Sequence, residues 1–168
     1  YGSALRKILK FNEKTTDYIE KRKSEMNLPI DYIAVHIRRG DKIVSREMKE
    51  LGLFLYIDAV KGKKHISRNV FIATDDGSVT DKLKSVLVAE GFNVYWNTAV
   101  TQTGFDESLF NTKDKKSRYI DTLNMLLDMD ILIHSSFFIG TYTSNVSRIV
   151  PLYVGFDKSF SLDDEWKL

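Results

Sequence analysis

Four short apolar runs, rich in β-branched and aromatic residues, alternate with amphipathic stretches along the chain, and this alternation limits the possible folds more than any other feature. The runs span residues 32–37, 70–74, 92–96 and 137–141. Apolar runs this short are typical of strands that are buried on both faces. Strands that alternate with helices form a parallel sheet with helices on both sides. We therefore predict an α/β fold with a Rossmann-like parallel sheet.

The stretches between these runs have the apolar spacing of helices, and helices are expected at 51–60, 78–90 and 119–127. Ser78 and Asp81 predict a capping box at the start of the middle helix, and Gly91 suits the position just after its end. We expect a helix over 2–26 that breaks near 15–16 and stops at Asn27-Leu28-Pro29. An irregular functional loop is expected over 97–117. A fifth strand is expected over 152–154, preceded by a short helix that Ser144 or Asn145 caps.

The length of 168 residues suits one domain with a sizeable core. We expect a single domain, with an N-terminal helical segment over 1–27 and the core over 30–168. The 25 basic and 23 acidic residues nearly balance, which gives no general attraction to nucleic acid or membranes, so an anion site must be local. The absence of cysteine excludes disulfides, zinc–cysteine sites and thiolate nucleophiles. No apolar run reaches the 18 residues or so of a membrane-spanning helix.

The chain begins with Tyr1 rather than Met, and we expect a piece of a longer protein rather than a processed N-terminus. The lack of cysteine favours a reducing compartment such as the cytoplasm. The sequon Asn145-Val146-Ser147 agrees, since a glycan there would obstruct the ligand-binding stretch described below.

In open parallel sheets, ligands bind beyond the C-terminal ends of the strands. The segment His36-Ile37-Arg38-Arg39-Gly40-Asp41-Lys42 follows the first strand and carries three cations within five positions. Arginine binds phosphate oxygens through two parallel N–H groups, lysine adds a point charge, and glycine allows the backbone to come close. This pattern predicts a pyrophosphate site that needs no metal, with a solvated charged loop as the alternative.

Two other strand ends carry polar groups. Thr74-Asp75-Asp76-Gly77-Ser78 offers hydroxyls and carboxylates to a ribose or base, although the same residues are common in turns and helix caps. Thr141-Tyr142-Thr143-Ser144-Asn145 offers small donors to a phosphate before a short helix, and the alternative is an ordinary N-cap.

The Asp128-Met129-Asp130 triplet raises the possibility of a metal-binding carboxylate pair, as in some glycosyltransferases. In a helix, however, the two side chains point about 200° apart, so we expect no metal site. His65 and His134 have no partners at ligand spacing and are expected to be structural or exposed. The chain contains no phosphate-binding P-loop, no Gly-x-Gly-x-x-Gly and no Gly-x-Ser-x-Gly motif.

Three of these stretches, in this order, resemble the donor-binding half of the α1,6-fucosyltransferases, a core-fucosylating family related to bacterial nodulation fucosyltransferases and to protein O-fucosyltransferases. The resemblance covers about Tyr32 to Trp166. The matching motifs are His36-Ile37-Arg38-Arg39-Gly40-Asp41-Lys42, Ile72-Ala73-Thr74-Asp75-Asp76, and Leu127-Asp128 through Thr141-Tyr142-Thr143-Ser144-Asn145-Val146-Ser147-Arg148, and Ser161-Leu162-Asp163-Asp164 resembles the stretch that follows in vertebrate members.

By this resemblance the chain would be the C-terminal, GDP-fucose-binding half of a GT-B glycosyltransferase, with an acceptor-binding domain upstream in the parent chain. The family works in the Golgi lumen, without a metal, on a glycan or glycoprotein acceptor. Arg38 matches the arginine that grips the β-phosphate, and Lys42 matches a lysine beside the reacting sugar. Thr143 and Ser144 match hydroxyls near the phosphates.

His36 and Asp128 match positions that touch guanine. A carboxylate can accept both N1–H and the 2-amino group of guanine, whereas adenine offers no such donor pair. The remaining motif residues expected to contact GDP-fucose are Arg39, Thr74, Asp75, Asp76 and Asn145.

The sequence departs from the family at the proposed general base, a glutamate ten residues after the signature histidine. Arg46 holds that position here, and Glu47 follows it. We expect Glu47 to act as the base in an inverting transfer of fucose from GDP-fucose to a glycan hydroxyl. The alternative is a catalytically silent nucleotide- or glycan-binding module of the same fold. A receiver-like signalling domain fits the alternation of elements but not the cations after the first strand.

Overall fold

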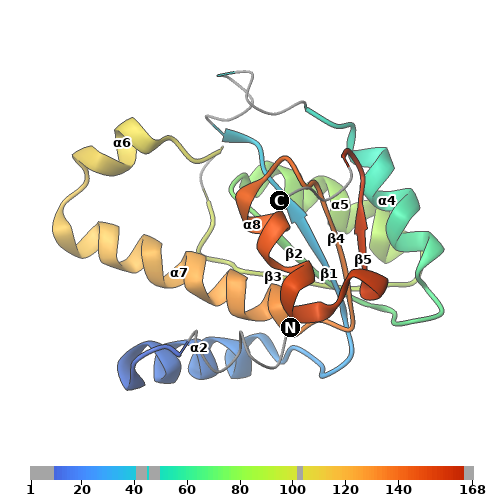
Figure 1. The fold of residues 1–168 in the computed structure, drawn as a ribbon, viewed down its shortest axis with the longest axis horizontal. Helices are drawn as coiled ribbons and strands as arrows, with labels where there is room; N and C mark the ends of the chain where they lie inside the picture. Colours follow the sequence, from blue (N-terminus) through green and yellow to red (C-terminus); the bar gives the residue numbers. More distant parts are fainter. Residues whose placement is uncertain (1–9, 41–44, 46–49, 102–103, 165–168) are drawn as a thin grey trace.

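The computed structural model describes residues 10–40, 45, 50–101 and 104–164. Its strands form one parallel sheet in the order β3-β2-β1-β4-β5, and helices cover both of its faces (Figure 1). The strands are β1 (Ile33–Ile37), β2 (Asn69–Thr74), β3 (Asn93–Trp96), β4 (Phe137–Gly140) and β5 (Ser159–Ser161). The predicted Rossmann-like α/β fold is confirmed.

The helices fall into connecting helices and short turns at the end of the chain. The longer ones are α2 (Glu13–Met26), α4 (Leu53–Gly62), α5 (Gly77–Ala89), α6 (Glu107–Thr112) and α7 (Lys115–Ile133). The short ones are α8 (Asn145–Ile149), α9 (Pro151–Val154) and the 3₁₀ turn η1 (Phe156–Lys158). No helix of the described ranges is long and apolar enough to cross a membrane.

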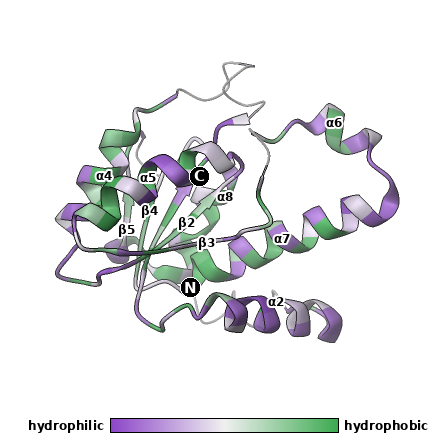
Figure 2. Cartoon of the chain, turned by 180° about the vertical axis from the view of Figure 1, so that it is seen from behind, coloured by the Kyte–Doolittle hydropathy of each residue, from purple (hydrophilic) through white to green (hydrophobic). Residues whose placement is uncertain are grey.

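The central strand β1 is buried along its whole length because its side chains alternate between two cores. Ile33, Val35 and Ile37 pack with α4 and α5 on one face. Ala34 packs with α2 and α7 on the other face, and His36 points to that same side. Figure 2 shows the hydrophobic strands at the centre and the largely hydrophilic helix α2 at the edge of the molecule.

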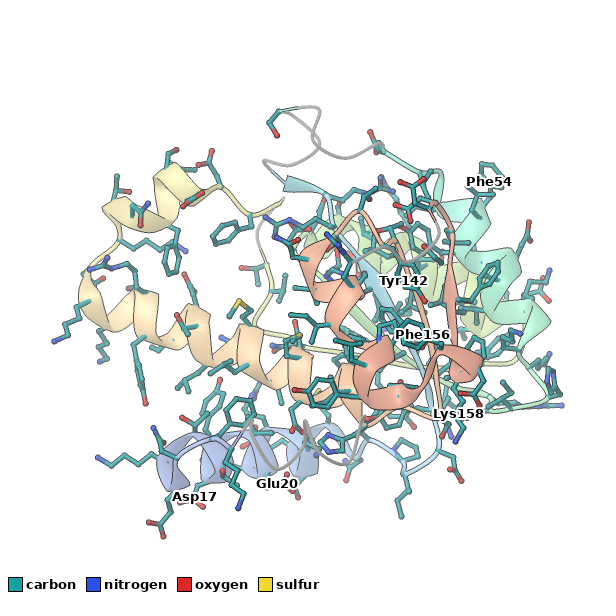
Figure 3. All side chains as sticks on the ribbon, in the orientation of Figure 1. Asp17, Glu20, Phe54, Tyr142, Phe156 and Lys158 are labelled. Carbon is teal, nitrogen blue, oxygen red and sulfur yellow. The ribbon has the colours of Figure 1, made fainter. Side chains whose placement is uncertain are left out.

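Helix α2 lies alongside α7 and forms the outer layer of that face (Figure 1). Its Ile19 is buried, whereas Asp17 and Glu20 point outward (Figure 3). Lys23 of α2 pairs with Asp130 of α7 at 3.1 Å. The charged face of α2 therefore stays in solvent while its apolar face extends the core.

The expected fifth strand is wrong. Leu152-Tyr153-Val154 belongs to helix α9, because Pro151 at its first position has a φ suited to a helix and lacks only an N–H that would be unpaired there. The edge strand is β5 instead. Gly155, whose φ of 109° ends α9, leads into the turn η1, and β5 follows this turn.

Two helix starts also differ from expectation. Asp76 caps α5 by accepting the Ser78 N–H at 2.9 Å, so the capping box at Ser78 and Asp81 is not formed. Helix α2 begins at Glu13, where the Asn12 side chain caps its first turn, and it runs through residues 15–16 without a break, whereas residues 2–9 of the expected helix lie outside the described residues. Gly91, with φ of 81°, and Ser144 occupy the cap positions that were expected.

The segment 97–117, expected to be irregular, contains helix α6 and the first turn of α7. Asp106 and Asp114 cap these two helices with their carboxylates. Helix α6 and the start of α7 extend beyond the sheet on the side of its C-terminal edge (Figure 1).

The chain crosses the sheet in two directions from β1. It moves outward through β2 and β3, and then returns to place β4 on the other side of β1. The chain that leaves β1 and the chain that leaves β4 therefore run in opposite directions along the sheet, and they diverge at the C-terminal ends of these two strands. Ligands of open α/β sheets bind at such a point.

Candidate functional site

A cavity of about 630 Å³ opens at the C-terminal ends of β1 and β4, between α7 and the start of α8. Arg38, Asp128 and Ser144, which lie far apart in the sequence, all line it. The other predicted site residues that line it are His36, Thr74, Asp75, Thr143 and Asn145. One cavity therefore collects residues from all three predicted motifs.

Two predicted residues face elsewhere. Arg39 donates to the Leu51 carbonyl at 2.8 Å and pairs with Glu50 at 3.0 Å. With Asp76, the cap of α5, it lines a separate hollow of about 450 Å³. Arg39 and Asp76 are thus parts of the scaffold in this structure. Lys42, Arg46 and Glu47 lie outside the described residues.

The Asp75 carboxylate, at the end of β2, holds two loops in place. It accepts the backbone N–H groups of Arg39 at 2.7 Å, Gly40 at 3.1 Å and Phe105 at 3.1 Å. The loops also touch directly, because a Cβ on Gly40 would collide with the Phe105 backbone. Gly104, at φ of 90°, donates to the Asp75 carbonyl at 2.9 Å. Through these hydrogen bonds Asp75 organises the cavity wall, and its contact with a ribose stays a prediction.

Asp75 also orients Arg38. The Arg38 guanidinium lies 3.1 Å from the carboxylate and 5.0 Å from the centre of the Phe105 ring. An arginine held by an ion pair and an aromatic face loses little further side-chain entropy when it binds an anion. Its side chain is 21% exposed, within the cavity lining.

His36 is a neutral hydrogen-bonding group. Burial, together with the charge of Arg38, lowers its pKa to about 3. Its Nδ1 lies 2.8 Å from Ser147 Oγ, and that oxygen already accepts the Thr141 N–H. Ser147 is fully buried and its hydroxyl has no other acceptor among the described residues, so it donates to Nδ1 and leaves the ring proton on Nε2 as a donor.

Asp128 projects from α7 into the same cavity. Its Oδ1 is closed off from solvent and has no hydrogen-bond partner in the described part of the chain. Burial raises the pKa of Asp128 to about 7, against a hydrogen bond from Asn97 that lowers it. The carboxyl group is therefore poised to accept hydrogen bonds from a ligand that repays its desolvation.

The neighbouring Asp130 has different partners. It pairs with Lys23 at 3.1 Å and with His134 at 3.5 Å, on the outer side of α7. Asp128 and Asp130 thus diverge as their spacing predicts. Among the described residues, no group of three or more His, Asp or Glu side chains is placed to hold a metal ion.

The loop after β4 is tied down by Asp163. This carboxylate accepts the Tyr142 N–H at 2.7 Å and the Thr143 N–H at 3.3 Å, and the Thr143 hydroxyl donates to it. Although burial opposes it, hydrogen bonding from Thr143 and Ser161 holds the pKa of Asp163 below its usual value. The Thr143 oxygen is left as an acceptor, whereas Ser144, buried and without a capping bond, keeps its hydroxyl for the cavity.

Several residues of the site were not predicted individually. Phe105 and Phe110 line the cavity and come from the segment 97–117, which was predicted as a functional loop, and Asn124 of α7 lines it as well. Asn97, at the start of that segment, bonds both Asp128 and Asn124. Helical spacing gave one signal, since Asn124 precedes Asp128 by four residues and so shares its face. The roles of Ser147 and Asp163 depend on long-range contacts that the sequence does not reveal.

Comparisons of the chain with protein families and with solved structures agree with the arrangement of this cavity. The family model for alpha-(1,6)-fucosyltransferase N- and catalytic domains matches residues 1–153. No sequence among the curated proteins matches the chain.

Solved structures with a similar fold include a fucosyltransferase NodZ from Bradyrhizobium, with a TM-score of 0.57 and 20% identity over 86% of this chain. POFUT1 in complex with GDP-fucose gives a TM-score of 0.60 and 14% identity over 95% of this chain. At these identities the likeness shows the fold. The chain spans 43% of the NodZ chain and 48% of the POFUT1 chain.

Replacing Asp75 tests its role in joining the loops. Asp75→Asn leaves one acceptor oxygen and turns an amide toward N–H donors, so we expect the free energy of unfolding to fall by about 2–4 kcal/mol. The neighbouring Asp76→Asn is the matched control, because asparagine caps helices as well as aspartate, and we expect a change of at most about 0.5 kcal/mol. Urea denaturation of both variants measures the difference, and equal losses would contradict this role.

The pH dependence of stability tests the burial of Asp128. Its pKa is raised from 3.8 in a free side chain to about 7 in the fold. The stability associated with the neutral acid is therefore complete below pH 3.8 and is lost as the pH rises through 7. We expect Asp128→Asn to melt at a higher temperature than the unchanged protein at pH 8 and at a similar temperature at pH 4. His36 titrates in both proteins and cancels in the comparison. A difference that does not vary with pH would show that the carboxyl is not desolvated.

Proposed function

This chain belongs to the α-(1,6)-fucosyltransferase family, and we propose that it binds GDP-fucose in the cavity between α7 and α8 as the donor domain of an inverting fucosyltransferase. The observation that carries the proposal is the presence, in one cavity, of an acceptor carboxyl at Asp128 and an oriented guanidinium at Arg38. A nucleoside diphosphate whose base offers two adjacent N–H donors matches both.

The guanine would lie at the α7 end of the cavity. Its N1–H and 2-amino groups would donate to the Asp128 carboxylate, satisfying the oxygen that has no other partner. Binding would thus lower the pKa of Asp128 from its raised value and keep the group ionised. His36, held neutral with its proton on Nε2, would supply a donor to an acceptor of the purine ring.

The diphosphate would lie between Arg38 and the start of α8. The Arg38 guanidinium would bind the β-phosphate, and Ser144 and Asn145 would donate from the opposite wall. Because Asp75 and Phe105 already orient Arg38, this charge needs little rearrangement to stabilise the leaving group.

In the reaction, the bond between fucose C1 and the β-phosphate oxygen breaks while an acceptor hydroxyl oxygen forms a new bond to C1 from the opposite face. The negative charge that develops on GDP would be stabilised by Arg38, with Lys42 as a second cation, and we propose that no metal takes part. The proton of the acceptor hydroxyl would pass to Glu47. The acceptor, a glycan or glycoprotein, would be held largely by a preceding domain of the parent chain.

A second candidate is a binding module of the same fold without turnover, which the arginine at position 46 favours. Incubation of the full-length parent protein with GDP-fucose and glycan acceptors separates the two. Release of GDP supports the transferase. Tight GDP binding with no release of fucose from the donor supports the module.

Arg38→Ala tests the diphosphate site. Loss of a charge-assisted contact is expected to weaken GDP binding by about 10- to 100-fold and to leave GMP binding nearly unchanged, since GMP lacks the β-phosphate. Arg39→Ala is the matched control, because Arg39 faces Glu50 and Leu51, and its GDP affinity should stay within about threefold of the unchanged protein.

Calorimetric titration in EDTA measures these affinities, and circular dichroism verifies that both variants are folded. Equal effects of the two substitutions, or binding of GDP only after Mg²⁺ is added, would contradict the proposed site.

A further inference from the structure

Asn124 lies one helical turn before Asp128 on α7 and lines the same cavity. The residue is only 9% exposed. We propose that Asn124 is a specificity-determining residue, which donates a hydrogen bond from Nδ2 to O6 of the guanine that Asp128 holds. This inference rests on the proposed function and adds a base contact that the sequence motifs do not contain.

The orientation of the Asn124 amide follows from a fixed backbone donor. The Ala99 N–H donates to Asn97 Oδ1 at 3.1 Å, so the Asn97 Nδ2 group must face the other way. One of its hydrogens goes to Asn124 Oδ1 at 3.3 Å, and it also bonds the Asp128 carboxyl. Rotating the Asn124 amide by 180° would bring two NH₂ groups together, which excludes that arrangement.

Tyr18 of helix α2 fixes the same oxygen from the other side. Its hydroxyl donates to Asn124 Oδ1 at 2.9 Å. Both contacts therefore fall on Oδ1, and the Asn124 Nδ2 group has no partner in the described part of the chain. Asn97 and Tyr18 are positioning residues, and they couple α2, which lies alongside α7, to the cavity (Figure 1).

The exposed pattern complements one edge of guanine. Along that edge the base presents the 2-amino donor, the N1–H donor and the O6 acceptor in sequence. Asp128 supplies two acceptor oxygens, and Asn124, about 5–6 Å along the same helix face, supplies a donor. With Asp128 alone, the site would accept any base that has two adjacent N–H donors. Asp128 and Asn124 together also require a carbonyl oxygen beside those two donors.

The test compares Tyr18→Phe with the double variant Tyr18→Phe and Asn124→Leu. Leucine has nearly the shape of asparagine, and removing the tyrosine hydroxyl avoids leaving that group unpaired. One Asn97 Nδ2 hydrogen still loses its acceptor in the double variant, and this loss lowers the affinity for GDP and for 6-thio-GDP alike, so the ratio of the two affinities is the readout. Titration calorimetry measures the affinity of each for GDP, for 6-thio-GDP, in which sulfur replaces O6, and for 3-deaza-GDP, in which carbon replaces N3.

We expect Tyr18→Phe to bind GDP about 3- to 10-fold more tightly than 6-thio-GDP, as one neutral hydrogen bond allows. The double variant should bind GDP more weakly than Tyr18→Phe by at least this factor, and it should bind GDP and 6-thio-GDP with equal affinity. Equal GDP affinity in the two variants would overturn the assignment. It would also be overturned if the Asn124 substitution removed the preference for GDP over 3-deaza-GDP and left the preference over 6-thio-GDP unchanged, because the contact would then lie at N3 of the base.

A measurement on the unsubstituted chain gives the same answer if the double variant does not fold. The Asn124 side-chain amide signals in ¹⁵N NMR should shift on addition of GDP and shift less with 6-thio-GDP, and equal shifts would overturn the assignment. Failure of the proposed function is distinguishable, because GDP would then not bind the unsubstituted chain. If GDP binds and only the Asn124 substitution has no effect, the donor domain stands and this contact does not.

Discussion

The adjacency of β1 and β4 is the constraint on which the site depends. These strands are separated by about a hundred residues, yet they pair in parallel through Ile33 and Phe137, so their C-terminal ends lie together. The end of β1 brings His36 and Arg38 to the cavity, and the loop after β4 brings Ser144. Asp75, at the end of the next strand, then locks the Arg38 loop to the segment at Phe105. A different strand order would scatter these groups over the surface.

The polar groups of the cavity are arranged at a cost to stability. His36 is kept neutral by burial, and the Asp128 carboxyl is kept protonated up to about pH 7. Each group loses hydration in the fold, and a base with matching donors and acceptors would restore those hydrogen bonds. The same desolvation makes the contacts selective, because a base with the wrong pattern leaves the buried oxygen of Asp128 unpaired. The amides of Asn97 and Asn124 extend this arrangement to helix α2.

The sequence was sufficient for strands β1 to β4 and for the polar residues at their C-terminal ends, because both follow from patterns of short range, whereas Asp128 was found through the family resemblance. Buried parallel strands appear as short apolar runs, and parallel sheets bind ligands at strand ends. It could not separate Arg38 from Arg39, since adjacent residues beyond a strand face different hollows and only the contact with Glu50 decides which. Nor could it show that Asp75 and Asp163 are occupied by backbone N–H groups distant in sequence.

Smaller errors have local causes. Leu152, Tyr153 and Val154 have the bulky apolar character of a strand, but they follow Val150 in a helical conformation and Pro151, which favours the first position of a helix. Asp76 rather than Ser78 caps α5, because the cap position is decided by where the strand ends. The assignments of Lys42 and Glu47 remain predictions of the family resemblance, as both lie outside the described residues.

The most direct test of a guanine-reading cavity is calorimetric titration of the chain and of Asp128→Asn with GDP, ADP and xanthosine diphosphate. Xanthine has a carbonyl where guanine has its amino group, so an asparagine, with one acceptor and one donor, matches it. We expect the unchanged chain to prefer GDP over ADP by about tenfold or more, and Asp128→Asn to prefer xanthosine diphosphate over GDP. Equal binding of GDP and ADP, or an unchanged preference for GDP in Asp128→Asn, would contradict the account.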